Sequence, residues 1–429
     1  MACAPNGREN QREDPPRVTE QRRSPHPFVY TILVLPFGAS SGYASVTLAY
    51  LATKSGLSVE QGAVLVAASL FPQMWKFFWS PVADLTLSRR RWYLLSCVMC
   101  AAGMFGTAAV PLAPPTFRLV EALVLASSVA ATFLGFALEG LIAHLTPPSD
   151  RGRVSGWYQA GNMAGTGIGG GIGLWLASNL HHGWESGMIL GALTLGCAAV
   201  LPWIPDVPAE SRGMSAGKAI RNTAVDFWRM IRSRVGVLSA ILCIVPVGTG
   251  AASGVLAQAE VAANWGAGPG HVELVQGFLN GIVSMVGSIV GGYGCIRLGG
   301  RVGYAVFGGL MAAITAAMAL LPATPATYIS CSLAYAFATG LCYAAFSCFV
   351  LEAIGAGSAA TKYNALASLS NTPIWYMGLI LAAVAQHRGP RDMLFAESGF
   401  GLLGILVFAV VAGAWRAHPA PVAATAQAG

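Results

Sequence analysis

The sequence predicts an all-α membrane protein in which 12 transmembrane helices form two six-helix repeats. Its 429 residues are 55% hydrophobic and only 10% charged, whereas a soluble domain carries about 25% charged residues. Apolar runs of membrane-spanning length recur along the chain, and one polar stretch divides them into two sets of six. These observations together argue against a soluble fold.

Each apolar run is long enough to cross a bilayer of ~30 Å. Six runs precede the polar stretch, at 28–51, 61–83, 92–112, 118–144, 153–179 and 185–204. Six follow it, at 236–262, 271–295, 302–322, 326–352, 360–385 and 393–415. The predicted domains are a disordered cytoplasmic tail at 1–26, helical bundles at 27–204 and 236–416, a cytoplasmic linker at 205–235 and a second tail at 417–429. The first tail lacks the apolar core of a cleavable signal peptide.

The distribution of positive charge predicts that both termini are cytoplasmic. In that orientation 20 of the 25 Lys and Arg residues lie in cytoplasmic segments and four lie in external loops, as the positive-inside rule requires. We therefore expect an integral protein of a bacterial-type inner membrane. The net charge of +7 comes from short clusters between apolar runs, and this pattern suits lipid headgroups better than nucleic acid.

The glycines, cysteines and histidines of this sequence do not form the patterns that bind cofactors or metals. The glycine-rich run at 161–173 lacks the Lys-Ser/Thr ending of a phosphate-binding loop, and its spacing favours close helix packing. The cysteines after Cys3 lie in or at the ends of apolar runs, as packing residues do. The histidines of the loops and span ends have no carboxylate companions at ligand spacing. We therefore expect that the protein binds no metal and no cofactor and that it is not an enzyme.

The two halves repeat each other at the loop after the second span of each half. Aligning Ser80 with Gly291 lays SPVADLTLSRR over GGYGCIRLGGR, so that Arg90 corresponds to Arg301. Parallel repeats with a solute pathway between them are a common transporter architecture. The sequence thus predicts two homologous bundles with a pathway between them.

Several motifs resemble a known family of transporters. The loop from Asp84 to Arg91 resembles the signature between the second and third spans of the major facilitator superfamily, with Leu85 and Ser88 where Arg and Gly are usual. Similarity to the muropeptide permease and peptide–acetyl-coenzyme A transporter branch rests on LPFG at 35–38, KFFWSPVAD at 76–84 and ATKYNALASLSN at 360–371. The resemblance covers essentially the whole chain and implies the major facilitator fold.

Two spans depart from that branch. The fourth reads ALEGLIAHL at 137–145, where muropeptide permeases typically have Asp followed by Tyr and Arg. The seventh reads IVPVGTGAASG at 244–254, where they often have a charged residue. Members of the branch carry anhydromuropeptides, siderophores or coenzyme A esters. The resemblance therefore implies a solute of this kind without selecting one.

Lys76 falls well inside the second predicted span. It lies eight residues before Asp84, hence ~12 Å from the cytoplasmic end of the helix. A lysine at this depth costs several kcal/mol unless it reaches a partner or a wet cavity. Lys76 therefore binds an anionic group of the solute, extends back to the headgroups or pairs with Glu139.

Three carboxylates are candidates for proton coupling. Glu139 lies about five residues before the end of the fourth span, where it can carry the coupling proton or form a gate pair with Arg151 or Arg153. Glu260 lies near the external end of the seventh span, and Glu352 lies near the internal end of the tenth. All three are interpreted as proton-coupling or gate residues.

The loop after the second span of each half is a predicted cytoplasmic gate. In the family such a loop stabilises the outward-open state through ion pairs and helix ends. The gate candidates are Asp84, Arg89, Arg90, Arg91 and Arg301. For the arginines, simple anchoring by the positive-inside rule is the alternative.

Neutral polar side chains at membrane depth are the predicted contacts for a sugar, peptide or amide group. Such side chains also join helices to one another. The substrate-binding candidates besides Lys76 are Ser40, Tyr43, Asn162, Asn280, Asn371 and Trp375. Asn162 and Asn371 fall in corresponding spans of the two halves, which favours that pair.

These features predict a secondary active transporter, a proton symporter that moves an amphipathic anionic solute by alternating access. A muropeptide is the first expectation, and a siderophore transporter, an acyl-coenzyme A transporter or a drug or metabolite efflux permease are the alternatives. A membrane enzyme or a non-transporting sensor fits the sequence less well. The expected partners are the small-molecule solute, H+ and membrane lipid, with no nucleic acid, and the expected state is a monomer.

Overall fold

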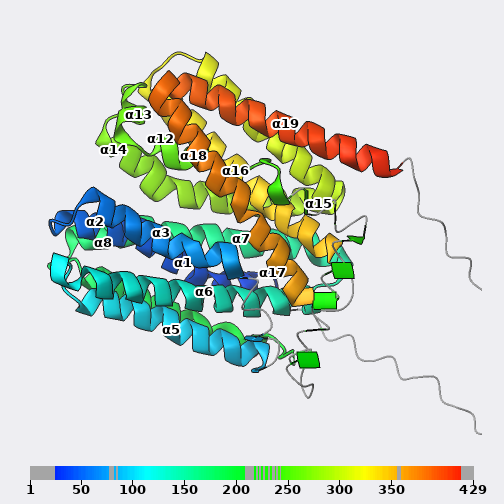
Figure 1. Cartoon of the computed structure of the whole chain (residues 1–429), viewed down its shortest axis with the longest axis horizontal. Coiled ribbons are helices and arrows are strands. Elements are labelled where there is room, and N and C mark those ends of the chain that lie inside the picture. The colour runs from blue at the N-terminus through cyan, green and yellow to red at the C-terminus, as the bar shows by residue number, and fades with distance from the viewer. Residues whose placement is uncertain are drawn as a thin grey trace, which may run out of the picture.

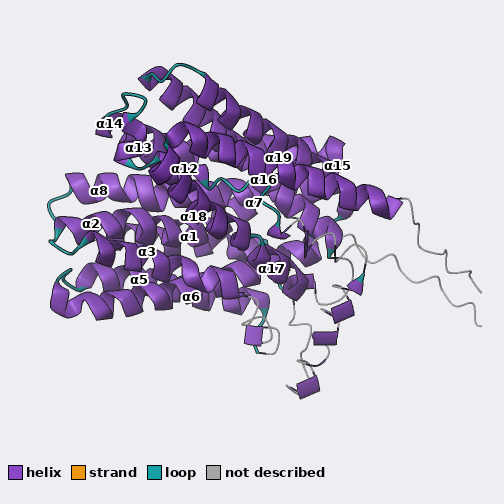
Figure 2. Ribbon diagram, turned by 45° about the horizontal axis from the view of Figure 1, so that its top comes forward, coloured by secondary structure: helices purple, strands orange, loops and turns teal. Residues whose placement is uncertain are grey.

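The computed structural model describes residues 25–76, 82–83, 86–207, single positions or pairs between 217 and 241, 243–354 and 359–416. Every regular element in these ranges is a helix (Figure 2). Eight stretches of them are long and apolar enough to cross a membrane. The described part of the chain therefore has the all-α membrane fold that the composition predicts.

The helices of the first half lie together, in blue to green colours in Figure 1. The first span combines α1 (Phe28–Gly42), η1 (Tyr43–Leu48) and α2 (Ala49–Lys54). The next three are α3 (Val59–Trp75), α5 (Arg89–Ala109) and α6 (Phe117–Leu145). The fifth combines α7 (Arg151–Gly167), η5 (Ile168–Ile172) and α8 (Gly173–Asn179), and the sixth combines α9 (Glu185–Cys197) and η6 (Ala198–Trp203).

The helices of the second half, in green to red colours, pack beside this first set (Figure 1). Short elements come first: α12 (Ala252–Leu256), α13 (Ala259–Ala263), α14 (Pro269–Val272) and η7 (Glu273–Leu279). Longer helices follow: α15 (Asn280–Leu320), α16 (Pro325–Ala353), α17 (Ala359–Leu369), α18 (Asn371–Arg388) and α19 (Pro390–Arg416).

The long helix α15 contains two of the predicted spans. Its path turns at Gly299, whose φ of 73° and ψ of 159° are not helical. A positive φ of this kind strains any residue with a Cβ, so glycine suits the turn. The eighth and ninth spans therefore meet where the hydropathy pattern separates them.

The seventh span differs from its prediction as one continuous helix over 236–262. Residues 245–251 are not helical, and Gly248 and Gly250 have φ values of 62° and 72°. Pro246 also lacks the N–H group that a helix interior needs. Hydropathy did not reveal this break because the residues of the segment are nearly all apolar.

The predicted glycine packing at 161–173 is confirmed, and it uses two faces of one span. A Cβ on Gly165 would lie 2.5 Å from the carbonyl oxygen of Leu35 in α1. A Cβ on Gly167 would lie 3.1 Å from the Cα of Gly281 in α15. Only glycine permits such approaches of backbone to backbone. One face of the fifth span thus packs within its own half, and the other packs against the second half.

The two halves also share one apolar cluster. It joins Leu138 and Ile142 of α6 to Phe349 of α16 and to Tyr363 and Leu366 of α17. These helices meet near the end of the molecule at which α5 starts with Arg89, Arg90 and Arg91 and the ninth span starts with Arg301. The cluster therefore closes the two halves together near this end.

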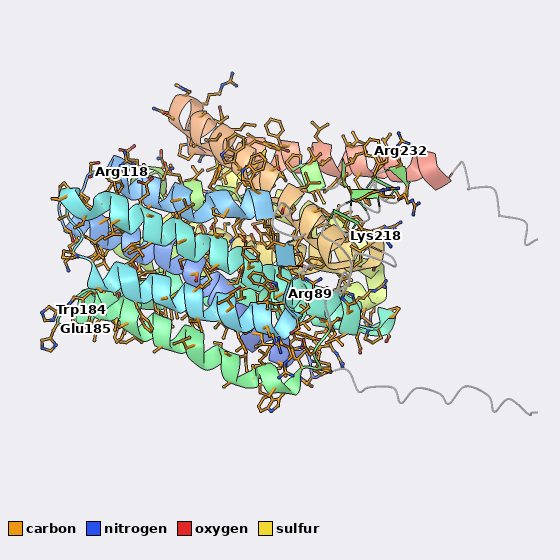
Figure 3. The ribbon with its side chains drawn as sticks, turned by 60° about the horizontal axis from the view of Figure 1, so that its bottom comes forward. Arg89, Arg118, Trp184, Glu185, Lys218 and Arg232 are labelled. Carbon is orange, nitrogen blue, oxygen red and sulfur yellow. The ribbon has the colours of Figure 1, made fainter. Side chains whose placement is uncertain are left out.

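The ends of the molecule carry different charged residues. Figure 3 places Arg118, Trp184 and Glu185 at one end of the helices, with Arg89, Lys218 and Arg232 toward the other. This is the separation that the predicted orientation requires. The orientation itself remains a prediction.

Candidate functional site

Lys76 and Glu139 form a buried ion pair. The Nζ of Lys76 lies 3.0 Å from Oε1 and 3.1 Å from Oε2 of Glu139, and each residue is only 4% exposed. Lys76 directly follows α3, whereas Glu139 belongs to α6. Of the three interpretations of Lys76, the structure shows the pair, so an extension to the headgroups is wrong. Arg153 instead lies 3.5 Å from Asp150, so the gate pair of Glu139 with Arg151 or Arg153 stays a prediction.

A tyrosine completes the surroundings of the carboxylate. The hydroxyl of Tyr158, on α7, donates to Oε1 of Glu139 at 3.0 Å, and Tyr158 is buried. Glu139 therefore accepts hydrogen bonds from two helical spans besides its own. A buried ion pair is tolerated when further hydrogen bonds satisfy it, but the loss of one partner is strongly destabilising.

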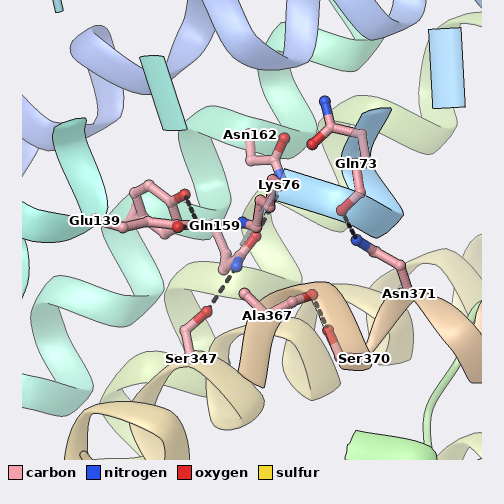
Figure 4. A network of polar contacts seen from close by, with 10 residues as sticks. Gln73, Lys76, Glu139, Gln159, Asn162, Ser347, Ala367, Ser370 and Asn371 are labelled. Carbon is pink, nitrogen blue, oxygen red and sulfur yellow. Dashed lines mark hydrogen bonds and ion pairs between the residues drawn. The ribbon is translucent and has the colours of Figure 1, made fainter. Parts of the chain in front are cut away.

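Polar contacts beside this pair cross from one half to the other. Next to Tyr158, Gln159 donates to Ser347 Oγ of α16 at 2.6 Å, and Asn162 donates to Gln159 Oε1 at 3.1 Å. Asn371 of α18 donates to the carbonyl oxygen of Gln73 of α3 at 3.3 Å. Figure 4 draws these groups together with Lys76 and Glu139. Asn162 and Asn371 thus both lie where the halves meet, as their matching positions suggest.

The helix α17 brings a second buried lysine close to this region. Lys362 is 8% exposed and Asn364 is fully buried, and α17 packs against α6. Lys362 lies in α17, within the span predicted at 360–385. Its position inside a predicted span is the sequence signal that could have identified it, as the same signal identified Lys76.

The three arginines at the start of α5 differ from one another. Arg89 is completely buried, with its guanidinium 4.5 Å above the ring of Phe136. The backbone N–H of Arg90 donates to Asp206 Oδ1 at 3.3 Å, and Arg91 is exposed. Simple anchoring at the membrane surface therefore suits Arg91 but not Arg89. Asp84 lies outside the described residues.

Glu352 and Arg301 lie at the corresponding place in the second half. The backbone N–H of Gly300 donates to Glu352 Oε1 at 2.8 Å, so the carboxylate of α16 meets the start of the ninth span. Arg301 is half-buried in the first turn of that helix. A carboxylate favours a helix N-terminus, so Glu352 holds the ninth span as Asp206 holds α5.

Ser40 and Tyr43 lie inside the first half and not at its junction with the second. Tyr43 is buried, and its hydroxyl lies 3.3 Å from Oγ1 of Thr107 on α5. Ser40, also buried, lines a small cavity with Tyr43, Thr107 and Ser128. This placement does not support the prediction that the two residues contact substrate at the junction.

The remaining candidates are spread over the second half. Asn280 Nδ2 donates to Ser253 Oγ at 2.9 Å and to Gln276 Oε1 at 3.0 Å, so it joins the seventh and eighth spans. Trp375 is 56% exposed, and Glu260 is exposed on α13. Neither belongs to the network that includes Lys76.

Residues 30–375 match the family model of the Major Facilitator Superfamily. The chain belongs to the Major Facilitator Superfamily. This major facilitator is accordingly a secondary transporter of the membrane and not an enzyme. No curated protein sequence matches it.

Two solved structures share its fold at low sequence identity. The human organic anion transporter MFSD10 (TETRAN) is 17% identical, with a TM-score of 0.65 over 92% of this chain and 100% of the other. The proton:xylose symporter XylE, bound to 6-bromo-6-deoxy-D-glucose, is 13% identical, with a TM-score of 0.61 over 90% of this chain and 95% of the other. At these identities the likeness shows the fold alone.

Proposed function

We propose that this major facilitator is a proton symporter for an amphipathic anionic solute and that the pair of Lys76 and Glu139 binds both the proton and the anion. The single observation that carries the proposal is the burial of this pair beside hydrogen bonds that join the two halves. In this scheme the solute is a muropeptide, and the protein lies in a bacterial-type inner membrane with both termini cytoplasmic.

The proposed exchange of charges uses the ion pair of Lys76 and Glu139. A proton on Glu139 makes the carboxyl neutral and leaves the ammonium of Lys76 without its counterion. A carboxylate or phosphate of the solute then replaces Glu139 at Lys76, so that proton and anion enter together and the buried charge stays balanced. When the solute leaves, Glu139 releases its proton and the pair forms again.

The contacts between the halves allow this exchange to change their arrangement. The hydrogen bonds from Gln159 to Ser347 and from Asn371 to Gln73 must break when the halves separate at this level. Each contributes only about 0.5–1.5 kcal/mol net. Solute binding at Lys76, beside Gln159, can therefore compensate for their loss.

The choice of solute class has a separate basis. The motifs at 35–38, 76–84 and 360–371 resemble muropeptide permeases, and one structure of the same fold is described as an organic anion transporter. The structure described as a proton:xylose symporter makes a proton the first coupling ion to test. Siderophores and acyl-coenzyme A are tested in parallel as the alternative solutes.

The decisive experiment measures uptake of labelled anhydromuropeptide into proteoliposomes, with and without an inward proton gradient. Glu139→Gln mimics the protonated residue, so it should retain solute exchange and lose the stimulation by the gradient. The double variant Lys76→Gln/Glu139→Gln should bind solute about 10–100-fold more weakly, the effect of losing one hydrogen bond to a charged group. Lys54→Gln, at an exposed position, is the matched control.

Each outcome bears on a different part of the proposal. Gradient-stimulated uptake that persists in Glu139→Gln would remove Glu139 from proton coupling. Unchanged solute affinity in the double variant would remove Lys76 from anion binding. Uptake of a siderophore or acyl-coenzyme A, but of no muropeptide, would change the solute class and leave the charge exchange in place.

A further inference from the structure

A second buried glutamate lies in the other half of the molecule, far from Lys76 in the sequence. Glu397 belongs to α19 and is 5% exposed. Its Oε1 accepts hydrogen bonds from the hydroxyls of Tyr335 at 2.7 Å and Thr249 at 3.3 Å. Its Oε2 is buried and has no hydrogen-bond partner. One carboxyl oxygen is therefore well satisfied and the other is bare.

Both hydroxyls connect this carboxyl to the break in the seventh span. The backbone N–H of Ala252 donates to the Tyr335 hydroxyl at 3.2 Å, and that of Ala251 donates to the Thr249 hydroxyl at 3.2 Å. These are N–H groups that the non-helical segment 245–251 leaves without helical partners. Two chains of hydrogen bonds thus run from the broken backbone through a hydroxyl to Glu397.

The broken segment is held tightly inside the second half. A Cβ on Gly248 would lie 2.6 Å from Sγ of Cys342 on α16, and a Cβ on Gly404 of α19 would lie 2.8 Å from Val245 and Val247. The hydroxyl of Tyr304, on α15, donates to the carbonyl oxygen of Val247 at 2.6 Å. The conformation of the segment therefore depends on the helices that surround Glu397.

No basic side chain among the described residues pairs with Glu397. The uncharged titratable groups of the surrounding elements include Tyr335, which donates to Glu397, and Cys243, Tyr304, Cys342, Tyr343 and Tyr376. The other carboxylates on these elements are Glu352, which accepts from the N–H of Gly300, and the exposed Asp392 at the start of α19. Among the basic residues on the same elements whose side chains are described, Arg297 and Arg301 flank the turn of α15 at Gly299, and His387, Arg388 and Arg391 lie at the ends of α18 and α19; all are exposed except the half-buried Arg301. An ionised Glu397 would therefore be a buried charge without a counterion, which is strongly unfavourable in a membrane helix.

We propose that Glu397 is a proton-binding site of the second half and that its proton maintains the non-helical segment 245–251. The proton resides on Oε2, the oxygen without a partner, while Oε1 keeps both hydrogen bonds. Loss of the proton creates a charge that needs water, so the segment must open. This site is independent of the charge exchange at Glu139, and it can be tested without any solute.

The arrangement favours a proton over a metal cation. A cation needs several oxygen ligands around it, whereas a proton needs one. The hydroxyls of Tyr335 and Thr249 donate to Oε1 and accept from backbone N–H groups, so each has only one lone pair left for a cation. Sodium is the alternative that the experiment must distinguish.

Infrared difference spectroscopy of the purified full-length protein tests the site directly. The wild type should show the carbonyl stretch of a protonated carboxyl group, which decreases as the pH rises. Glu397→Gln should lack this band, whereas Glu139→Gln should retain it. Tyr335→Phe keeps the carboxyl but removes a hydrogen bond to Oε1, so it should move the band to higher frequency. A band that is unchanged in both Glu397→Gln and Tyr335→Phe would overturn the proposal.

Two further measurements test the opening of the segment and the identity of the bound cation. Alkylation of Cys342, mapped by mass spectrometry and normalised to the equally buried Cys97 of the first half, should increase with pH in the wild type and stay flat in Glu397→Gln. A constant ratio in the wild type would show that the segment does not open. Thermal stabilisation by sodium chloride over choline chloride, lost in Glu397→Gln, would show that the site binds sodium and would refute the proton assignment.

Discussion

The two halves of this transporter bury glutamates in opposite ways. Glu139 and Glu397 are about equally inaccessible, and each accepts a hydrogen bond from a buried tyrosine, Tyr158 at 3.0 Å and Tyr335 at 2.7 Å. Glu139 also holds the ammonium of Lys76, whereas no cation of the described chain pairs with Glu397. Burial therefore does not decide the role of an acidic residue in a membrane helix; the source of its neutralising charge does.

Glu139 and Glu397 also lie in different parts of the fold. Glu139 lies where α6 and α7 face the second half, beside the contact between Gln159 and Ser347. Glu397 lies within the second half, beside the broken seventh span. The first carboxylate can respond when the halves move relative to each other, and the second can respond when one span changes its shape.

The largest expected loss of stability comes from removing the cation beside Glu139, which leaves Glu139 without a basic partner, as Glu397 is among the described residues. Lys76→Met leaves a buried carboxylate without its cation and should lower the free energy of unfolding by about 3–5 kcal/mol. Denaturant or thermal unfolding in detergent measures it, with the exposed Lys54→Met as the matched control. Adding Glu139→Gln to Lys76→Met should restore most of the loss. A single variant as stable as the wild type would contradict the role of the pair.

An intermediate effect distinguishes the two tyrosines. Tyr335→Phe leaves both the Ala252 N–H and Glu397 with fewer partners, and it should cost about 1–3 kcal/mol. Tyr158→Phe should cost about 1 kcal/mol, because Glu139 keeps both contacts with Lys76. Unfolding of the two variants side by side gives the comparison. The reverse order of stabilities would show that Glu397 depends less on its tyrosine than we infer.

The smallest expected effect is that of Glu397→Gln. If Glu397 is already neutral, the amide replaces it with nearly the same shape and still accepts at Oε1, so stability should change by less than about 1 kcal/mol. Glu139→Gln, in contrast, should destabilise strongly in the absence of solute because it leaves Lys76 unpaired. Equal losses in the two variants at neutral pH would indicate that both glutamates are ionised.

Part of the site could be found from the chain alone. Lys76 and Glu139 each stood out as charged groups inside apolar runs, and their pairing was one of the alternatives. Glu397 within 393–415 and Lys362 within 360–385 show the same signal, although neither is among the predicted site residues. The break in the seventh span had its own signal in Pro246, Gly248 and Gly250, which hydropathy does not register.

Other features had no signal in the sequence. Arg89 and Arg91 are two residues apart in one cluster, yet one packs against Phe136 and the other is exposed. Tyr43 is a polar aromatic residue at membrane depth, as a substrate-binding residue can be, yet its hydroxyl contacts Thr107 within its own half. These outcomes depend on the rotation of each helix about its axis, which packing against neighbouring helices decides.

The sequence by itself determined the all-α membrane fold, and it predicts two sets of six spans and their sidedness. It could do so because a bilayer cannot satisfy exposed backbone groups, so apolar runs of this length form helices wherever lipid faces them; the break at 245–251 occurs where the second half buries the backbone. Tertiary structure alone decided which charges meet. Lys76 and Glu139 are 63 residues apart, and Tyr335 and Glu397 are 62 apart, so helix packing had to bring them together before either carboxyl group had its partner.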